Sequence, residues 1–229
     1  DAILMMKKQW DAFSLNAALG ASINDKTVNS TRYDSKTASL KYANVFNLAN
    51  IIMNGSAGLD QKIDARRQLQ SLFATAQLGY NEFVYLDLSA RNDWSSTLAY
   101  TSHEKSGFFY PSVGFSLIFN KLMTLPRWVS LAKIRGAYSM VGNDIPMFIT
   151  NPSSHITAGG EFLASDAAPF KDMEPEMTHS FEAGIEARFL KNRIGLNATF
   201  YKTNTRNQFF KLPTLSGDKY AYRYVNAGD

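Results

Sequence analysis

The stretch of sequence that decides the fold runs from residue 13 to residue 24 and reads FSLNAALGASIN. Its odd-numbered positions are apolar: Phe13, Leu15, Ala17, Leu19, Ala21 and Ile23. Its even-numbered positions are small and mostly polar: Ser14, Asn16, Ala18, Gly20, Ser22 and Asn24. A period of two residues is the repeat of a β-strand, whose successive side chains point to opposite faces. The pattern therefore predicts a strand with two faces in different surroundings.

The same alternation recurs along the chain, and it predicts strands at 69–80, 83–92, 109–119, 131–141, 178–189 and 193–203. An eighth strand is expected to begin near Tyr220. Each segment is about as long as the ~9–11 residues that a tilted strand needs to cross a bilayer. Strands of soluble proteins are shorter, about 5–6 residues in most cases. Strand length therefore favours a transmembrane barrel over a soluble β-sandwich.

The connections between these strands alternate in length. The long ones span about 24–68, 93–107, 142–178 and 204–219, and the short ones are 81–82, 120–128 and 191–192. In a meander, all long loops lie at one end and all short turns at the other, as in outer-membrane barrels with long extracellular loops. We expect an all-β fold: residues 1–229 form an antiparallel up-and-down transmembrane β-barrel segment of about 7–8 strands within a larger barrel.

The polar face of the predicted strands carries the charged residues Asp87, Arg91, Lys133, Arg135, Glu182, Glu186 and Arg188. A basic residue on the lipid face near the bilayer midplane costs about 2–4 kcal/mol, and acidic residues cost less. The apolar face is therefore predicted to contact lipid and the polar face to line the lumen. Aromatic residues near the strand ends are expected at the membrane interfaces; they are Tyr80, Phe109, Phe119, Tyr138 and Phe189.

Composition excludes several other classes of protein. The chain has no cysteine, so it has no disulfide and no thiolate chemistry. The formal net charge is only +4, and no run of Lys or Arg exceeds two residues, so nothing indicates nucleic-acid binding. No segment approaches the roughly 18 apolar residues of a transmembrane helix. The first eight residues do not resemble a signal peptide, because their charges follow the apolar run. Both ends look cut.

Catalytic and metal-binding patterns are weak. His103, His155 and His179 lack the close spacing of metal ligands. Glu182 and Glu186 are four residues apart on a strand, roughly 13 Å, which is farther than the ~5–9.5 Å of glycosidase carboxyl pairs. We expect them instead to pair across strands with the basic residues Arg188, Lys133 or Arg135. The sequence therefore predicts no enzyme, no metal site and no cofactor.

Six strings follow one another in an order that resembles the SusC/RagA family of TonB-dependent transporters. They read YLDLSARNDWSS (85–96), FYPSVG (109–114), LAKIRGAYSMVGND (131–144), EPEMTHSFEAG (174–184), NRIGLNATFY (192–201) and VNAG (225–228), with FNLAN (46–50) in the preceding loop. The residues that carry the resemblance most specifically are Arg91, Asn92, Asp93, Trp94, Tyr110, Pro111, Lys133, Arg135, Gly142, Asn143, Pro175, Glu176 and Glu182.

The resemblance implies an outer-membrane barrel of Bacteroidetes, thought to have 22 strands, that imports oligosaccharides or peptides. It also implies two partners: TonB, which acts on an N-terminal plug, and a SusD-like surface lipoprotein, which caps the extracellular loops. This sequence contains neither a plug domain nor a TonB box. Substrate contacts are expected from loops 24–68 and 142–178, and Trp94 is expected to anchor the interface more than to stack on sugar. A passive porin-like channel and a soluble β-rich binding module remain the alternatives.

Overall fold

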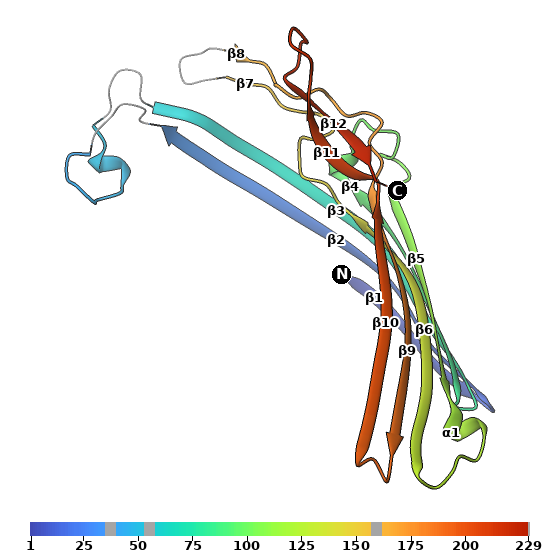
Figure 1. Cartoon of the computed structure of the whole chain (residues 1–229). Coiled ribbons are helices and arrows are strands. Elements are labelled where there is room, and N and C mark those ends of the chain that lie inside the picture. Colours follow the sequence, from blue (N-terminus) through green and yellow to red (C-terminus); the bar gives the residue numbers. More distant parts are fainter. Residues whose placement is uncertain (35–39, 53–57, 157–161, 229) are drawn as a thin grey trace.

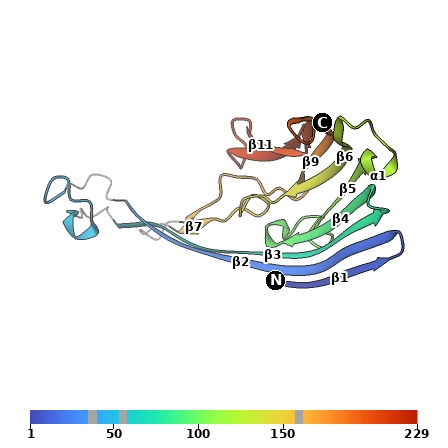
Figure 2. The same ribbon diagram turned by 90° about the horizontal axis from the view of Figure 1, so that it is seen from below.

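The computed structural model describes residues 1–34, 40–52, 58–156 and 162–228. Eight strands form one antiparallel sheet in the order β1-β2-β3-β4-β5-β6-β9-β10 (Figure 1). Their bounds are Ala2–Trp10, Phe13–Asp34, Gly58–Tyr80, Val84–Ser95, Phe108–Ile118, Val129–Asn143, Glu176–Phe189 and Ile194–Arg206. Seen from the end, the sheet is an open arc (Figure 2). The antiparallel meander predicted from the alternation is confirmed.

The remaining elements are short. Strands β7 (His155–Ile156) and β8 (Phe162–Leu163) pair with each other, as do β11 (Gln208–Pro213) and β12 (Tyr222–Ala227). The helical segments are η1 (Leu48–Asn50), η2 (Ser96–Leu98) and α1 (Phe119–Leu122). No helix in the described ranges is long and apolar enough to cross a membrane.

Two expectations about the strands need correction. The strand near Tyr220 exists as β12, but it pairs with β11 in a separate two-stranded sheet. The eighth strand of the large sheet is instead β1, which pairs with β2 from Ala2↔Ala21 to Trp10↔Phe13. Its apolar run is short and ends in two lysines, so it offers little alternation to recognise. Phe119, expected at a strand end, begins α1.

Strands β2 and β3 continue well beyond the predicted segments. Residues 25–34 and 58–68, expected to lie in a loop, form the outer part of this hairpin and remain paired with each other from Asp25↔Gln68 to Asp34↔Gly58. Neighbouring strands accompany only the inner part, so the outer part projects as a two-stranded ribbon (Figure 1). The alternation ends in this part, because charged residues occupy both faces: Asp25 and Arg66 have one facing, and Lys26 and Arg67 have the other.

The register shows that the two faces extend across the whole sheet. Residues directly opposite each other in a ladder point to the same face. One row crosses all eight strands as Met5, Ala18, Thr75, Ser89, Ser112, Ser139, Ser180 and Thr203. The next row toward the short turns has the opposite facing and reads Met6, Ala17, Ala76, Leu88, Val113, Tyr138, Phe181 and Lys202. Polar and apolar rows therefore alternate in register.

Aromatic rings gather at the edge of the sheet where the short turns lie. Trp10 stacks on Phe13, which contacts Tyr80, and Tyr80 meets the edge of Phe83, with ring centroids 6.2, 4.9 and 5.5 Å apart. Farther along the same edge, Trp128 stacks on Phe189 at 5.6 Å. Such rows of aromatics mark the boundary between hydrocarbon and head groups in membrane barrels. Tyr138, in contrast, lies inside β6 and not at its end.

The tight turn between β3 and β4 belongs to this edge. Asn81 and Glu82 have φ values of 46° and 57°, as the central residues of a type I′ hairpin turn require. The Lys121 ammonium lies 2.6 Å from the Glu82 carboxylate. Its hydrogen bond and its charge lower the pKa of the exposed Glu82 carboxyl below the ordinary value.

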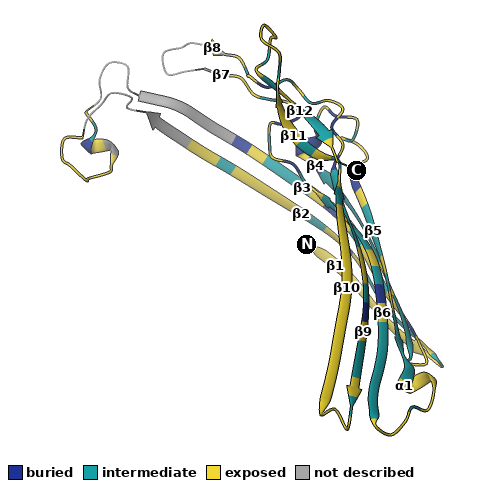
Figure 3. Cartoon of the chain, in the orientation of Figure 1, coloured by how far each residue is buried: buried dark blue, intermediate teal, exposed yellow. Residues whose placement is uncertain are grey.

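At the opposite edge, the long connections fold onto one another and form a small core of their own. The buried residues Leu98, Phe108, Ile145, Ile149 and Met173 pack together. Partly buried aromatics surround them: Tyr110, Phe170, Phe209 and Tyr224. The buried positions of the molecule gather mostly at this edge, whereas the strands below it are largely intermediate or exposed (Figure 3). We call this cluster the loop core.

Asp144 holds the loop core to the sheet. Its carboxylate lies 2.6 Å from the Arg67 guanidinium of β3 and accepts hydrogen bonds from the Ser95 and Thr97 hydroxyls. It also accepts from the backbone N–H of Ile145 at 2.8 Å. Its side chain is only 12% exposed. One carboxylate therefore ties together β3, the end of β4, η2 and the segment that follows β6.

We predict that Asp144→Ala loosens the loop core while the strands stay intact. Removal of the carboxylate leaves a partly buried Arg67 and two hydroxyls without their acceptor, at a cost of about 2–3 kcal/mol to local stability. Hydrogen exchange of the amides in 96–98 and 145–150 should accelerate, whereas amides in β4 and β5 should keep their protection. Asp218→Ala, in an exposed turn, is the matched control and should leave exchange unchanged. Equal exchange in both variants would contradict the assignment.

Candidate functional site

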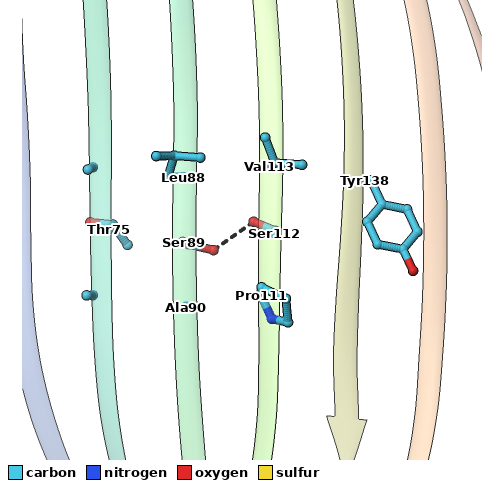
Figure 4. Close-up of a pocket in the computed structure, with 10 residues that line it drawn as sticks. Thr75, Leu88, Ser89, Ala90, Pro111, Ser112, Val113 and Tyr138 are labelled. Carbon is cyan, nitrogen blue, oxygen red and sulfur yellow. Dashed lines mark hydrogen bonds between the residues drawn. The ribbon is translucent and has the colours of Figure 1, made fainter.

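The polar face of the sheet carries a band of hydroxyl and amide side chains. Ser89 and Ser112 lie 2.7 Å apart between β4 and β5, and Ser180 and Thr203 lie 3.3 Å apart between β9 and β10. Two rows closer to the short turns, on the same face, the Gln77 amide donates to the Asp87 carboxylate at 2.8 Å. Figure 4 shows the Ser89–Ser112 contact in place between the two strands. These groups offer donors and acceptors along the strands as well as across them.

Charged residues of both signs lie on the same face, nearer the short turns. A depression of 310 Å³ is lined by Asp87, Lys133, Arg135 and Glu182 together with serines of β5 and β6. The Arg135 guanidinium donates to the Thr199 hydroxyl at 2.8 Å. Glu186 pairs with Arg188 at 2.9 Å, but the pair lies two residues apart along one strand and not across strands as expected. Glu182 forms no ion pair with another described residue.

Arg91, Asp93 and Tyr110 come together at the outer end of β4 and β5. The Arg91 Nε donates to Asp93 at 2.7 Å, and the Tyr110 hydroxyl donates to the other oxygen of the same carboxylate. Another guanidinium nitrogen of Arg91 donates to the Ser71 hydroxyl at 2.9 Å, and the guanidinium lies 5.8 Å from the centre of the Phe73 ring. Asp93 is buried, and Arg91 and Tyr110 provide the hydrogen-bond partners that a buried carboxylate needs.

Asn92 and Trp94 point to the opposite face and hold the loop that follows β4. The Asn92 amide donates to the carbonyl of Ser106 at 3.2 Å, and the Trp94 indole donates to the carbonyl of Lys105 at 3.0 Å. These bonds support the expected anchoring role of Trp94. Pro111, beside Ala90 in the ladder, lines a shallow depression of 360 Å³ over small residues of β3 and β4 (Figure 4).

The signature residues of β6 and β9 meet at the same outer edge. The Asn143 amide donates to the Glu176 carboxylate at 3.2 Å, and Pro175 is buried beside it. A Cβ at Gly142 would lie 3.3 Å from Met177, Phe108 and Tyr110, so this position has room for little more than glycine. The structure thus brings most of the signature together at the outer edge. Lys133, Arg135 and Glu182 lie apart, lower on the polar face.

Two residues of the outer edge lie within the signature strings, but the strings alone predicted no role for them. Asp144 is one, and Asn226 is the other. The Asn226 side chain exchanges hydrogen bonds of 2.8 and 2.9 Å with the backbone of Glu174 and donates to the carbonyl of Asn207 at 2.6 Å. It therefore joins β12 to the start of β9. The sequence contains one signal that could have identified both: each is the last polar residue of its signature string.

Within the described ranges, no group of three or more His, Asp or Glu side chains is placed to hold a metal ion. His179 lies on β9 and hydrogen-bonds through Nδ1 with the Tyr138 hydroxyl at 2.7 Å. His103 lies in the loop after β4. The side chain of His155 lies outside the described set. Glu182 and Glu186 are on one face, four positions apart along β9.

Solved structures with a similar fold include a peptide transporter and a siderophore receptor. The RagAB peptide transporter matches with a TM-score of 0.77 at 19% identity, over 98% of this chain and 25% of that chain. The RagAB peptide importer in the open-open state matches with a TM-score of 0.78 at 21% identity, over the same shares. The siderophore receptor PirA from Pseudomonas aeruginosa matches at 0.58 and 14% identity, over 99% of this chain and 36% of that chain.

These likenesses establish the fold, and the chain spans about a quarter of the length of the RagAB chains that it matches. No curated protein sequence matches the chain. A family model does, over nearly the whole length: "TonB dependent receptor-like, beta-barrel" covers residues 6–229. The two-faced antiparallel sheet, the aromatic edge and this match lead to one conclusion: the chain belongs to the family of TonB-dependent receptor β-barrels.

Proposed function

We propose that this chain is part of the wall of a SusC-like, TonB-dependent importer in the outer membrane of a Gram-negative bacterium of the Bacteroidetes. The observation that supports this most directly is the division of strands β2 to β6, β9 and β10 into an apolar and a polar face. In this proposal the apolar face contacts lipid and the polar face lines the lumen. The long connections are then extracellular and the short turns periplasmic.

The polar face suits a polar, oligomeric substrate. Its serine and threonine hydroxyls can bond to sugars or to peptide backbones, and its charges of both signs complement peptide termini and side chains. We propose that the cargo is an oligosaccharide or a peptide. The RagAB proteins, to which the fold is similar, are described as a peptide transporter and a peptide importer, and this likeness supports a peptide as one of the two candidates.

The partners follow from the same proposal. A SusD-like surface lipoprotein would dock on the long connections, where the loop core gives it a folded platform in place of separate flexible loops. TonB would act through a plug region that this sequence does not contain. The protein would have no catalytic role: its charged residues serve as a wall for passage and as ties between strands.

Energy coupling of uptake tests the proposed import function. If the barrel is an energised importer, uptake of its oligomeric cargo by cells should cease when the proton gradient is collapsed or when TonB is deleted, because binding alone does not move cargo past a plug. Radiolabelled peptide and oligosaccharide pools, offered separately, also report the substrate class. A passive channel would keep importing under both treatments, and that result would overturn the proposal.

The second prediction concerns the facing of the sheet. Leu88 and Ser89 are neighbours on β4 with opposite facing. Leu88 lies five residues beyond Phe83, about 13 Å from the aromatic edge and near the middle of the ~25 Å apolar band. Leu88→Arg should therefore cost about 2–4 kcal/mol and reduce assembled barrel in the outer membrane.

Ser89→Arg is the matched control, because it adds the same side chain one position away. It should assemble normally, as judged by heat-modifiable migration on gels, while it narrows the lumen and lowers uptake. If Ser89→Arg blocked assembly and Leu88→Arg did not, the facing proposed for the sheet would be reversed.

A further inference from the structure

Toward their outer ends, strands β9 and β10 carry basic residues on the lipid-facing side of the sheet. Register puts Lys202 opposite Phe181, His179 opposite Asn204 and Arg206 opposite Met177, all with the facing of the apolar residues. Lys202 and Arg206 are exposed. Two cations and a histidine therefore lie together on adjacent strands, on the face that elsewhere in these strands is apolar.

The height of this cluster explains why it is tolerated. Ile194 lies opposite Phe189 in the aromatic edge, and Lys202 and Arg206 lie eight and twelve residues beyond it on β10. Strands tilted by ~40° gain roughly 2.6 Å of height per residue, so the two cations stand about 20 and 30 Å above that edge. The apolar band is about 25 Å tall. The cluster therefore straddles the outer boundary of the membrane.

No counter-charge for these cations is present on this face. In β6, β9 and β10, no Asp or Glu has the lipid-facing parity, and neither Lys202 nor Arg206 forms a salt bridge within the described part of the chain. His179 hydrogen-bonds through Nδ1 to the Tyr138 hydroxyl at 2.7 Å, and its Nε2 takes no part in this hydrogen bond. Such a cluster is complementary to an anion at head-group height.

An apolar depression lies directly below the cluster. It measures 540 Å³, and its lining is mostly apolar, with Arg135 and Thr199 as the polar members; the other lining residues are Phe115, Ile134, Ala183, Gly184, Ile185, Ala198 and Phe200. Phe200 is two positions before Lys202 on the same face of β10. Strand β10 is an edge of the described sheet, but a neighbouring strand would pair with its edge and leave this face open. The depression has the position that an acyl chain takes beneath its head group.

We propose that this surface, formed by His179, Lys202, Arg206 and the depression below them, binds a phosphorylated lipid of the outer leaflet. The phosphate lies between the two cations, and an acyl chain lies along the depression. The proposal rests on the placement of the barrel in an outer membrane. It is independent of what the barrel imports, since it concerns the outside of the wall.

The test is lipid retention by the purified full-length receptor, measured by native mass spectrometry from detergent. Monophosphoryl lipid A is the probe, and its dephosphorylated form and inorganic phosphate are the comparisons. Lys202→Gln combined with Arg206→Gln should weaken retention of the phosphorylated lipid about 10- to 30-fold, the combined contribution of two basic residues near an anionic head group. Added salt should weaken binding to the unchanged receptor.

Two further variants separate recognition from folding. Lys202→Arg with Arg206→Lys keeps both charges and should retain the lipid. Lys171→Gln with Lys219→Gln removes two exposed cations outside the sheet and should change nothing. Heat-modifiable migration checks assembly in each case, and the single variants replace the double one if it fails to assemble. Equal retention by the Gln variants and the unchanged receptor, equal binding of the dephosphorylated lipid, or equal binding of inorganic phosphate alone would each overturn the proposal.

Discussion

The fold depends on one constraint: in hydrocarbon, every backbone N–H and C=O must find its partner within the protein. The eight strands meet it by pairing side by side, each with the next strand along the sheet. Strands β1 and β10 form the two edges, and every side chain of β1 and nearly every one of β10 is exposed. Such edges are stable in lipid only when further strands pair with them, as they do in a closed barrel.

The same constraint separates the faces. Because a strand repeats every two residues, one face can be given wholly to lipid and the other to water, and the register keeps the rows aligned across the sheet. Beyond the membrane both faces of a strand contact water, and the alternation of apolar and polar residues is no longer required. There the chain is held by specific bonds instead: Arg91 and Tyr110 with Asp93, Arg67 with Asp144, and Asn226 with the backbone at Glu174. The signature strings gather where patterning ends and hydrogen-bond networks begin.

The contrast between patterned strands and a hydrogen-bonded outer edge explains which parts of the structure could be predicted from the sequence. The alternation foretold the inner part of most strands and the facing of their residues, since that information is carried by each strand separately. It missed β1, whose short apolar run ends in Lys7 and Lys8, and it missed the outer ribbon of β2 and β3, where both faces are polar. It placed a strand near Tyr220 but missed its partner β11, which lies in the segment 204–219 that was expected to be a loop. The role of Asp144 depends on residues 47–77 positions away and has no local pattern.

The central claim is that β4 has one side in lipid and the other in an aqueous lumen, and single-cysteine labelling measures it directly, because this part of the receptor has no cysteine of its own. Single cysteines placed in turn at residues 84–91 of the receptor, in intact outer membranes, can be labelled with a charged, water-soluble maleimide. The account predicts labelling that alternates along the strand, high at 85, 87, 89 and 91 and low at 84, 86, 88 and 90. Uniform labelling, or alternation with the opposite phase, would contradict it.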